Sequence, residues 1–392
     1  MRTSKTLMIV STALVSAAAA GLIAASAAAA PGHAAPGHPG QPAGQSFPSY
    51  SVKTILNGAV LTHHNSHTGK KEALSKPDDL TSFGGDLFTA FQNGVGPQGE
   101  PSTTNNADST VVEFTPGGSV VAQWDLRGKV DGLTANPATG EVIATVNEDL
   151  HSSLYSIEPG GEVIHYQYSK PLPHNGGTDA ISFFKGQMLV SASAPGTTGA
   201  AAPNAKYPAV YSVTLNQTTH AATTKPYYYD EAGARLANKD LGARIRLALT
   251  DPDSSEVVPW SAPRFRGNFM LNSQGDQELI FSWDSGSRWV LKLPQSVDDT
   301  AWATSWDGKL YATDSGADKV VVVNSRKFWP GTAFVAVTPC NANSAPATCP
   351  APPKFPANYL GLLNMATGQI IPVELHGGTL HPVGLVFMDS DS

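Results

Sequence analysis

The chain has 392 residues and a formal net charge of −7, from 25 lysines and arginines against 32 aspartates and glutamates. Without a run of basic residues, it offers no electrostatic footprint for nucleic acid, so the sequence excludes that class of partner. The part that follows the first 49 residues is longer than a usual domain, but all-β propellers often run to such a length as one unit.

The first segment, residues 1–30, is predicted to be a secretory signal peptide. Two basic residues, Arg2 and Lys5, precede an Ala-rich apolar stretch that ends in small residues. Cleavage after Ala27, after Ala30 or a few residues later would each fit the small residues that a signal peptidase needs. We therefore expect a secreted or extracytoplasmic protein without membrane contact after cleavage; an uncleaved anchor is the alternative.

The second segment, residues 31–49, contains mostly Pro, Gly, Ala and Gln. These residues have almost nothing to bury, so ordering them would cost conformational entropy without return. We predict a flexible leader, followed by a single domain at residues 50–392.

A repeat begins after the leader. The stretches "PDDLTSFGGDLFTAFQNG", "VDGLTANPATGEVIATVN", "TDAISFFKGQMLVSASAPG" and "DDTAWATSWDGKLYATDSGADKVVVV" each join an Asp, a short apolar strand, a Gly-containing turn and a second strand. Asp79, Asp131 and Asp179 recur about every 50 residues, which is the period of a propeller blade rather than of a hairpin. The sequence therefore predicts an all-β propeller.

Two further strands follow each such pair, as in "SLYSIEPGGEVIHYQY", where Pro-Gly-Gly supplies the turn. Each blade should therefore have four antiparallel strands. A weaker copy at Arg264–Leu293 brings the count to six blades, with seven as the alternative because Ser325–Ala357 is hard to phase. Pairing of the N-terminal "YSVKTILNG" with the C-terminal "LHPVGLVFMD" would close the ring and remove exposed sheet edges.

Two segments, Asn238–Pro263 and Pro339–Asn358, break the period. We expect both to be loops on one face of the propeller, with one short helix at "DLGARIRLAL" in the first. The second contains the two cysteines of the chain, Cys340 and Cys349. Export to an oxidising compartment predicts a local disulfide between them.

The repeats resemble those of the NHL, senescence-marker-protein/gluconolactonase and streptogramin-lyase-like propellers of secreted bacterial proteins. The similarity covers most of Val52–Asp389 and is carried by "VDGLTANPATGEVIATVN", "DDTAWATSWDGKLYATDSGADKVVVV" and "LHPVGLVFMD". The motif is structural, so the resemblance implies the fold and only weakly an activity.

Four aspartates are candidate metal ligands because a propeller brings equivalent positions of its repeats together at the central channel. Carboxylates crowded there repel one another, and a hard cation such as Ca²⁺ or Mg²⁺ would relieve the repulsion. The alternative is that each Asp accepts N–H hydrogen bonds in the turn that enters its own strand. The candidates are Asp79, Asp131, Asp179 and Asp299.

Histidines are the candidate acid/base groups. Streptogramin-lyase-like propellers use a His as a base beside a magnesium ion. The resemblance therefore implies this role for His174 or His381, which lie at blade entrances. The Glu-Gly-Pro opening that supplies a metal ligand in the lactonases is absent, which puts lactonase-type hydrolysis in doubt. The loop "LTHHNSHTGKK" places His63, His64 and His67 close together, where a turn is the alternative to a zinc or copper site.

These patterns predict a secreted propeller that binds a small molecule, glycan or protein through its loop-bearing face without catalysing a reaction of it. No complete catalytic set accompanies the scaffold. The alternative is a metal-dependent hydrolase or lyase with its site at the central channel, and a third reading is a cell-wall-associated structural protein. We expect a monomer.

Overall fold

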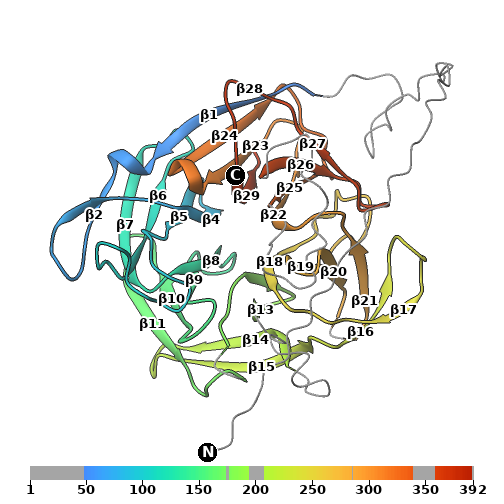
Figure 1. The fold of residues 1–392 in the computed structure, drawn as a ribbon, viewed down its shortest axis with the longest axis horizontal. Coiled ribbons are helices and arrows are strands. Elements are labelled where there is room, and N and C mark those ends of the chain that lie inside the picture. The colour runs from blue at the N-terminus through green and yellow to red at the C-terminus, as the bar shows by residue number, and fades with distance from the viewer. Residues whose placement is uncertain (1–47, 174–175, 194–206, 285, 339–357, 391–392) are drawn as a thin grey trace, which may run out of the picture. The chain divides into compact units, whose positions relative to one another are not determined.

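Short β-strands dominate a computed structural model of the chain, which describes residues 48–173, 176–193, 207–284, 286–338 and 358–390. The strands β4, β8, β12, β18, β22 and β29 each stand at one end of their strand order, and those that Figure 1 labels lie around the centre of the ring. Each of them contacts the next around the ring, and β29 contacts β4 again. The all-β propeller predicted from the repeats is confirmed, and the described part of the chain has six innermost strands.

The first three blades follow chain order from the axis outwards, as predicted. Blade 1 contains β4 (Pro77–Phe83), β5 (Asp86–Phe91), β6 (Asp108–Phe114) and β7 (Val120–Arg127). Blade 2 contains β8 (Val130–Ala135), β9 (Val142–Val146), β10 (Ser153–Ile157) and β11 (Val163–Tyr168). Blade 3 contains β12 (Ile181–Phe184), β13 (Gln187–Ser191), β14 (Pro208–Asn216) and β15 (Ala221–Tyr229). The outer strands β11 and β15 pair in parallel and join blades 2 and 3 into one eight-stranded sheet.

Blade 4 corrects the interpretation of Asn238–Pro263 as a loop. Its innermost strand is β18 (Pro252–Val257), followed by β19 (Phe269–Ser273), β20 (Glu278–Ser282) and β21 (Arg288–Lys292). The predicted helix, residues 240–249, instead contains β17 (Arg244–Arg246), which forms a hairpin with β16 (Gly233–Leu236). The hairpin forms because β16 pairs with the outer strand β21, which satisfies backbone groups at that edge.

The last two blades exchange strands, which the sequence did not predict. Blade 5 contains β22 (Val297–Trp302), β25 (Ala333–Val337), β26 (Tyr359–Leu363) and β27 (Ile370–Pro372). Blade 6 contains β29 (Pro382–Met388), β23 (Lys309–Asp314), β24 (Lys319–Ser325), β1 (Tyr50–Asn57) and β28 (Leu375–His376). The repeat read as one unit at 298–323 therefore divides between two blades.

The two ends of the described chain share blade 6 without pairing directly. β29 pairs with β23, and β1 pairs with β24 on the outer side (Figure 1). Ring closure therefore uses strands from both ends, as predicted, but two strands separate them.

The remaining elements are short. A hairpin of β2 (Thr62–His64) and β3 (Lys71–Ala73) precedes blade 1, and two 3₁₀ turns lie at Gly58–Val60 and Ser315–Ala317. No helix of the described chain has the length and apolar content to cross a membrane. Apolar clusters between neighbouring blades form the core; one joins β4, β5 and β6 to β23 and β24 through Phe91, Phe114 and Tyr311.

Candidate functional site at the propeller axis

Five of the six innermost strands carry an irregularity of two residues where they reach the axis; in blade 3, Asp179 and Ala180 precede β12 at the equivalent places. In blade 1 the pairing with β5 jumps from Pro77 to Leu80, and similar jumps occur in blades 2, 4, 5 and 6. β-Bulges redirect side chains, and here they turn a pair of residues per blade towards the channel. We call the two places the first and second bulge positions.

The first bulge position is an aspartate in five of the six blades. These residues, which we call the axial aspartates, are Asp78, Asp131, Asp179, Asp253 and Asp298; Val383 takes the sixth place. They line a cavity of about 40 Å³ at the face where the inner strands begin. Such a cavity has room for a few water molecules or an ion.

The second bulge position locks each inner strand to its neighbour. The carboxylate of Asp79 accepts an N–H hydrogen bond from Leu133 of the next blade at 2.8 Å, and that of Asp299 accepts one from Leu385 at 2.6 Å. Gly132 and Gly384 occupy equivalent places, where the next blade leaves no room for a side chain. Asp79 and Asp299 therefore have backbone partners in the neighbouring blade.

This arrangement corrects the predicted phase of the four candidate ligands. Asp131 and Asp179 hold the first bulge position, whereas Asp79 and Asp299 hold the second, although all four line the same cavity. The sequence contains double Asp at 78–79 and 298–299, and the structure places the first member of each pair, Asp78 and Asp298, in phase with Asp131 and Asp179. Asp253 was missed because its strand was taken for a loop; the similarity of Pro252-Asp253 to Pro77-Asp78 was the available signal.

Two glutamine amides hold neighbouring axial aspartates together. The Nε2 of Gln92 donates to Asp78 at 2.8 Å and to Asp131 at 3.1 Å. In the same way, Gln274 Nε2 donates to Asp253 and Asp298. Each amide group therefore fixes one oxygen of two carboxylates and leaves their second oxygens for another partner.

Lys129 is the described cation nearest to the axial aspartates. Its Nζ lies 2.7 Å from Asp131 Oδ1 and also pairs with Glu148. Burial alone would lower the pKa of Lys129, but the carboxylates of Asp131 and Glu148 outweigh it and hold the pKa raised. One lysine cannot neutralise the whole group of carboxylates.

The axial carboxyls are held well above their ordinary acidity. Burial first, and then the other carboxylates, raises the pKa of Asp78 to about 8 and that of Asp298 to about 7. The same causes raise the pKa values of Asp131, Asp179 and Asp253 well above the usual range. The site therefore requires protons or a bound cation at neutral pH.

The carboxylate oxygens of the axial aspartates suit a hard divalent cation, although they do not surround a single point in this structure. All donors are carboxylate oxygens, which Ca²⁺ and Mg²⁺ prefer. Asp131 is 5% exposed, and its Oδ2 is buried without a hydrogen-bond partner. Among the described residues, no three acidic or histidine side chains yet surround one point closely enough to hold an ion. The residues that would hold a cation are the axial aspartates.

A larger cavity of about 290 Å³ continues the channel towards the opposite face. Its wall combines inner-strand residues, including Thr81, Thr134 and Glu256, and Asp79 and Asp299 border both cavities. A small ligand in this cavity would approach the acidic end of the channel directly.

The candidate histidines do not complete a catalytic site in the described chain. His381 lines a groove beside β1 and β24, its side chain is 47% exposed, and its Nδ1 lies 3.8 Å from Asp314. It is not part of the axial cavity lining. His174 lies outside the described residues, as do Cys340 and Cys349, so the predicted disulfide stays a prediction.

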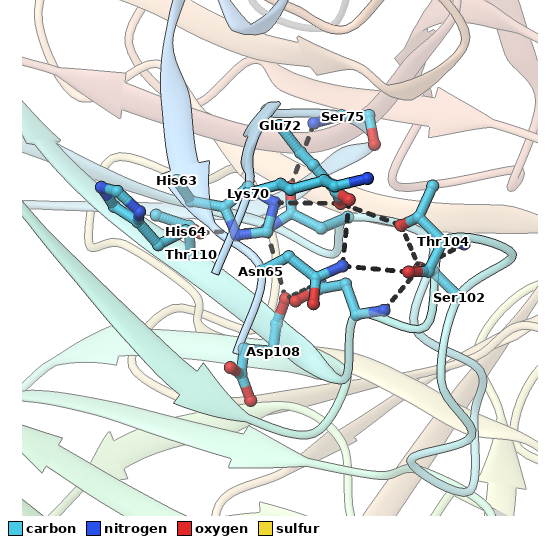
Figure 2. Close-up of polar contacts among 12 residues, drawn as sticks. His63, His64, Asn65, Lys70, Glu72, Ser75, Ser102, Thr104, Asp108 and Thr110 are labelled. Atoms are coloured by element: carbon cyan, nitrogen blue, oxygen red, sulfur yellow. Dashed lines mark hydrogen bonds and ion pairs between the residues drawn. The ribbon is translucent and has the colours of Figure 1, made fainter. Parts of the chain in front are cut away.

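The histidine-rich loop forms a structural turn (Figure 2). The Nδ2 of Asn65 donates to Glu72 at 2.9 Å and to the Thr104 carbonyl at 3.0 Å. His63 is buried 4.0 Å from Glu72, whereas His64 and His67 are exposed. The three histidines do not converge, so the turn is the correct alternative.

Comparisons with known proteins find solved structures with a similar fold. No family model matches the chain, and no curated protein matches it. A streptogramin B lyase structure is 11% identical, covers 86% of this chain and 91% of its own, and gives a TM-score of 0.41. A gluconolactonase-like protein is 12% identical, with 86% and 84% covered and a TM-score of 0.39. A protein of unknown function from Bacteroides thetaiotaomicron is 9% identical, with 85% and 65% covered and a TM-score of 0.44.

These likenesses concern the fold alone. At such identities and TM-scores they say nothing of activity, and function has to be argued from the site.

Proposed function

We propose that this protein is a binding propeller whose axial aspartates take up a hard divalent cation, Ca²⁺ or Mg²⁺. The cation would neutralise the carboxylates that Lys129 leaves unbalanced and would present open coordination positions to a ligand in the 290 Å³ cavity. The ligand class is a small, oxygen-bearing molecule, because a hard cation prefers oxygen donors.

One observation carries the proposal: five blades place an aspartate at the same bulge position around one cavity. A purely structural role would not require aspartates at this position in five blades. The structural hydrogen bonds at the bulges come from the second position and from threonines such as Thr145, whose Oγ1 accepts the Gly132 N–H at 2.9 Å. Four of the axial aspartates, Asp78, Asp131, Asp253 and Asp298, instead accept hydrogen bonds from side-chain amides, and Asp131 Oδ2 has no partner in the described chain.

We favour binding over turnover because His381, the candidate histidine within the described residues, is not in the lining of either channel cavity. A hydrolase or lyase at the channel is the alternative, in which a carboxyl of raised pKa such as Asp78 would serve as the acid. Turnover of a lactone or ester that is lost on Asp78→Asn would establish that alternative.

Export of the protein is part of the proposal and rests on the signal-like residues 1–30. Outside the cell, calcium sites with Kd values of about 10⁻⁴–10⁻³ M are effective. A site of modest affinity would therefore be occupied there.

Thermal unfolding with Ca²⁺, Mg²⁺ or EDTA tests the cation site. A cation bound by the folded state raises the unfolding midpoint, with about 2.7 kcal/mol of added stability at a hundredfold excess over Kd. The double variant Asp131→Asn/Asp179→Asn should lose this shift, while Asp307→Asn, an exposed aspartate away from the axis, should keep it. An equal midpoint in EDTA and in each cation would refute the proposal.

A further inference from the structure

Four of the seven tryptophans lie on loops at the face where the inner strands end, opposite the axial aspartates. They are Trp260, Trp283, Trp306 and Trp329, on the loops after β18, β20, β22 and β24. Trp260 is 72% exposed, Trp283 46% and Trp306 42%. Large apolar side chains gathered in this way mark an interaction site.

Trp260 and Trp283 border one glycine. A Cβ added to Gly267 would lie 3.0 Å from the Trp260 indole and 3.3 Å from that of Trp283. Gly267 also has φ +67°, a left-handed conformation that favours glycine. The glycine thus keeps the space between the two indoles open.

The aromatic surface continues onto the neighbouring blade. A Cβ on Gly331 would lie 2.3 Å from the Ser261 carbonyl oxygen, so the loops that bear Trp260 and Trp329 are in contact. Trp306 and Trp329 pack edge to face at 4.8 Å between ring centroids. A surface of this extent suits an elongated ligand with several linked rings better than a ligand with one small ring.

A positively charged groove adjoins Trp283. It has a volume of about 440 Å³, is lined by Arg235, Arg244 and Arg288, and has no acidic residue in its lining. Trp283 directly follows Ser282 of β20, which pairs with Arg288 of β21. Lys185 adds another cation 3.9 Å from the Trp283 ring centroid, and Asp284 is the acidic residue that interacts with Lys185 and Arg288. Such positive charge stands out on a chain with a net charge of −7.

Two of these arginines lie opposite each other in one hairpin, and Arg235 also donates from Nη1 to the Gly242 carbonyl at 3.3 Å. Arg235 of β16 pairs with Arg244 of β17 in the antiparallel register. Like charges directly opposite in a sheet destabilise it, and in the described chain the ion pair of this hairpin belongs to Arg246 with Glu231. An anion between the two guanidinium groups would convert the repulsion into a bidentate interaction.

We propose that this face of blade 4 binds an acidic saccharide chain, with one of its sugar rings on Trp260 and Trp283 and the carboxylate of another on Arg235 and Arg244. Sugar rings present C–H groups to an aromatic face and hydroxyls at their edges, while a carboxylate matches the guanidinium fork. A polynucleotide is disfavoured by the net negative charge. The inference rests on the proposed binding role but not on the axial cation.

Calorimetry with an oligogalacturonate tests the inference, with a neutral cello-oligosaccharide, inorganic phosphate and adenosine monophosphate as comparison ligands. All titrations are run in EDTA and repeated in Ca²⁺, so that failure of the axial site does not affect the result. Only the oligogalacturonate should bind well. Arg235→Gln/Arg244→Gln and Trp260→Ala should each weaken binding about tenfold or more.

Arg127→Gln, an exposed arginine on blade 1, is the matched control and should bind as the unaltered protein does. Circular dichroism and the unfolding midpoint show whether each variant is folded. Equal binding of the neutral oligosaccharide, tighter binding of the nucleotide, full affinity in Trp260→Ala, or no binding of the oligogalacturonate would each overturn the inference.

Discussion

Raising the pH in the presence of EDTA should destabilise this protein, and calcium should remove the effect. The axial carboxyls keep their protons in the folded state because burial and mutual repulsion raise their pKa values, to about 8 for Asp78 and about 7 for Asp298. In the unfolded chain the same groups ionise near pH 4. Between these values the folded state holds more protons than the unfolded state, so its stability falls as the pH rises.

The size of the effect follows from proton linkage. Each carboxyl that is protonated only in the folded state lowers the unfolding free energy by about 1.4 kcal/mol per pH unit. Asp78 and Asp298 keep part of their surface open to the channel, so we count one to two such protons between about pH 5 and 7. At about 2 °C per kcal/mol for a chain of this size, the midpoint should drop by about 3–6 °C per pH unit beyond pH 5.

The assay is thermal unfolding by circular dichroism from pH 4.5 to 8, in EDTA and in calcium. The Asp131→Asn/Asp179→Asn variant, which carries two fewer axial carboxyls, should show a shallower decline in EDTA. Stability that is flat or rising over this pH range in EDTA would refute the reasoning, because the carboxylates would then be stabilised as anions by other groups.

Two further results are expected. Gly132→Ala should lose about 1–3 kcal/mol of unfolding free energy, measured in urea, because the new Cβ would meet the Asp179 carbonyl oxygen at 2.3 Å and Thr145 Oγ1 at 2.6 Å. Gly233→Ala is the control, because nothing lies within 4 Å of a Cβ there. Equal stability of the two variants would contradict the close packing of neighbouring inner strands. His381→Ala should change neither calcium binding nor stability by more than about 0.5 kcal/mol, since its side chain is half exposed outside the axial cavity. A large loss of calcium affinity in that variant would place the histidine in the site.

Local patterns predicted the blades well where the chain keeps its order. The Asp-led units and Gly turns of blades 1 to 3 fold as their alternation of apolar and polar residues indicates, because hairpin pairing depends on nearby residues. The threonines of the second strands, such as Thr89 and Thr145, also recur for a local reason: their hydroxyls bond the bulges of their own blades.

The errors fall where the decisive contact is distant in sequence. β18 was taken for a loop because eleven residues separate it from its partner β19, from 258 to 268, and no short turn signals the pair. The exchange between blades 5 and 6 was missed because β22 skips the adjacent hairpin and pairs with β25. Non-local pairing of this kind leaves no periodic trace in the sequence.

The sequence by itself determined the all-β class, the blade period and the presence of aspartates where inner strands begin, because these follow from strand alternation, turn residues and repetition. Only the tertiary structure decided which aspartate of each pair takes which bulge position. In double Asp at 78–79 and 298–299 the two residues are chemically identical and both line the cavity, but only the second of each pair accepts a backbone N–H of the next blade. That choice depends on a neighbouring strand more than fifty residues away, which no local pattern records.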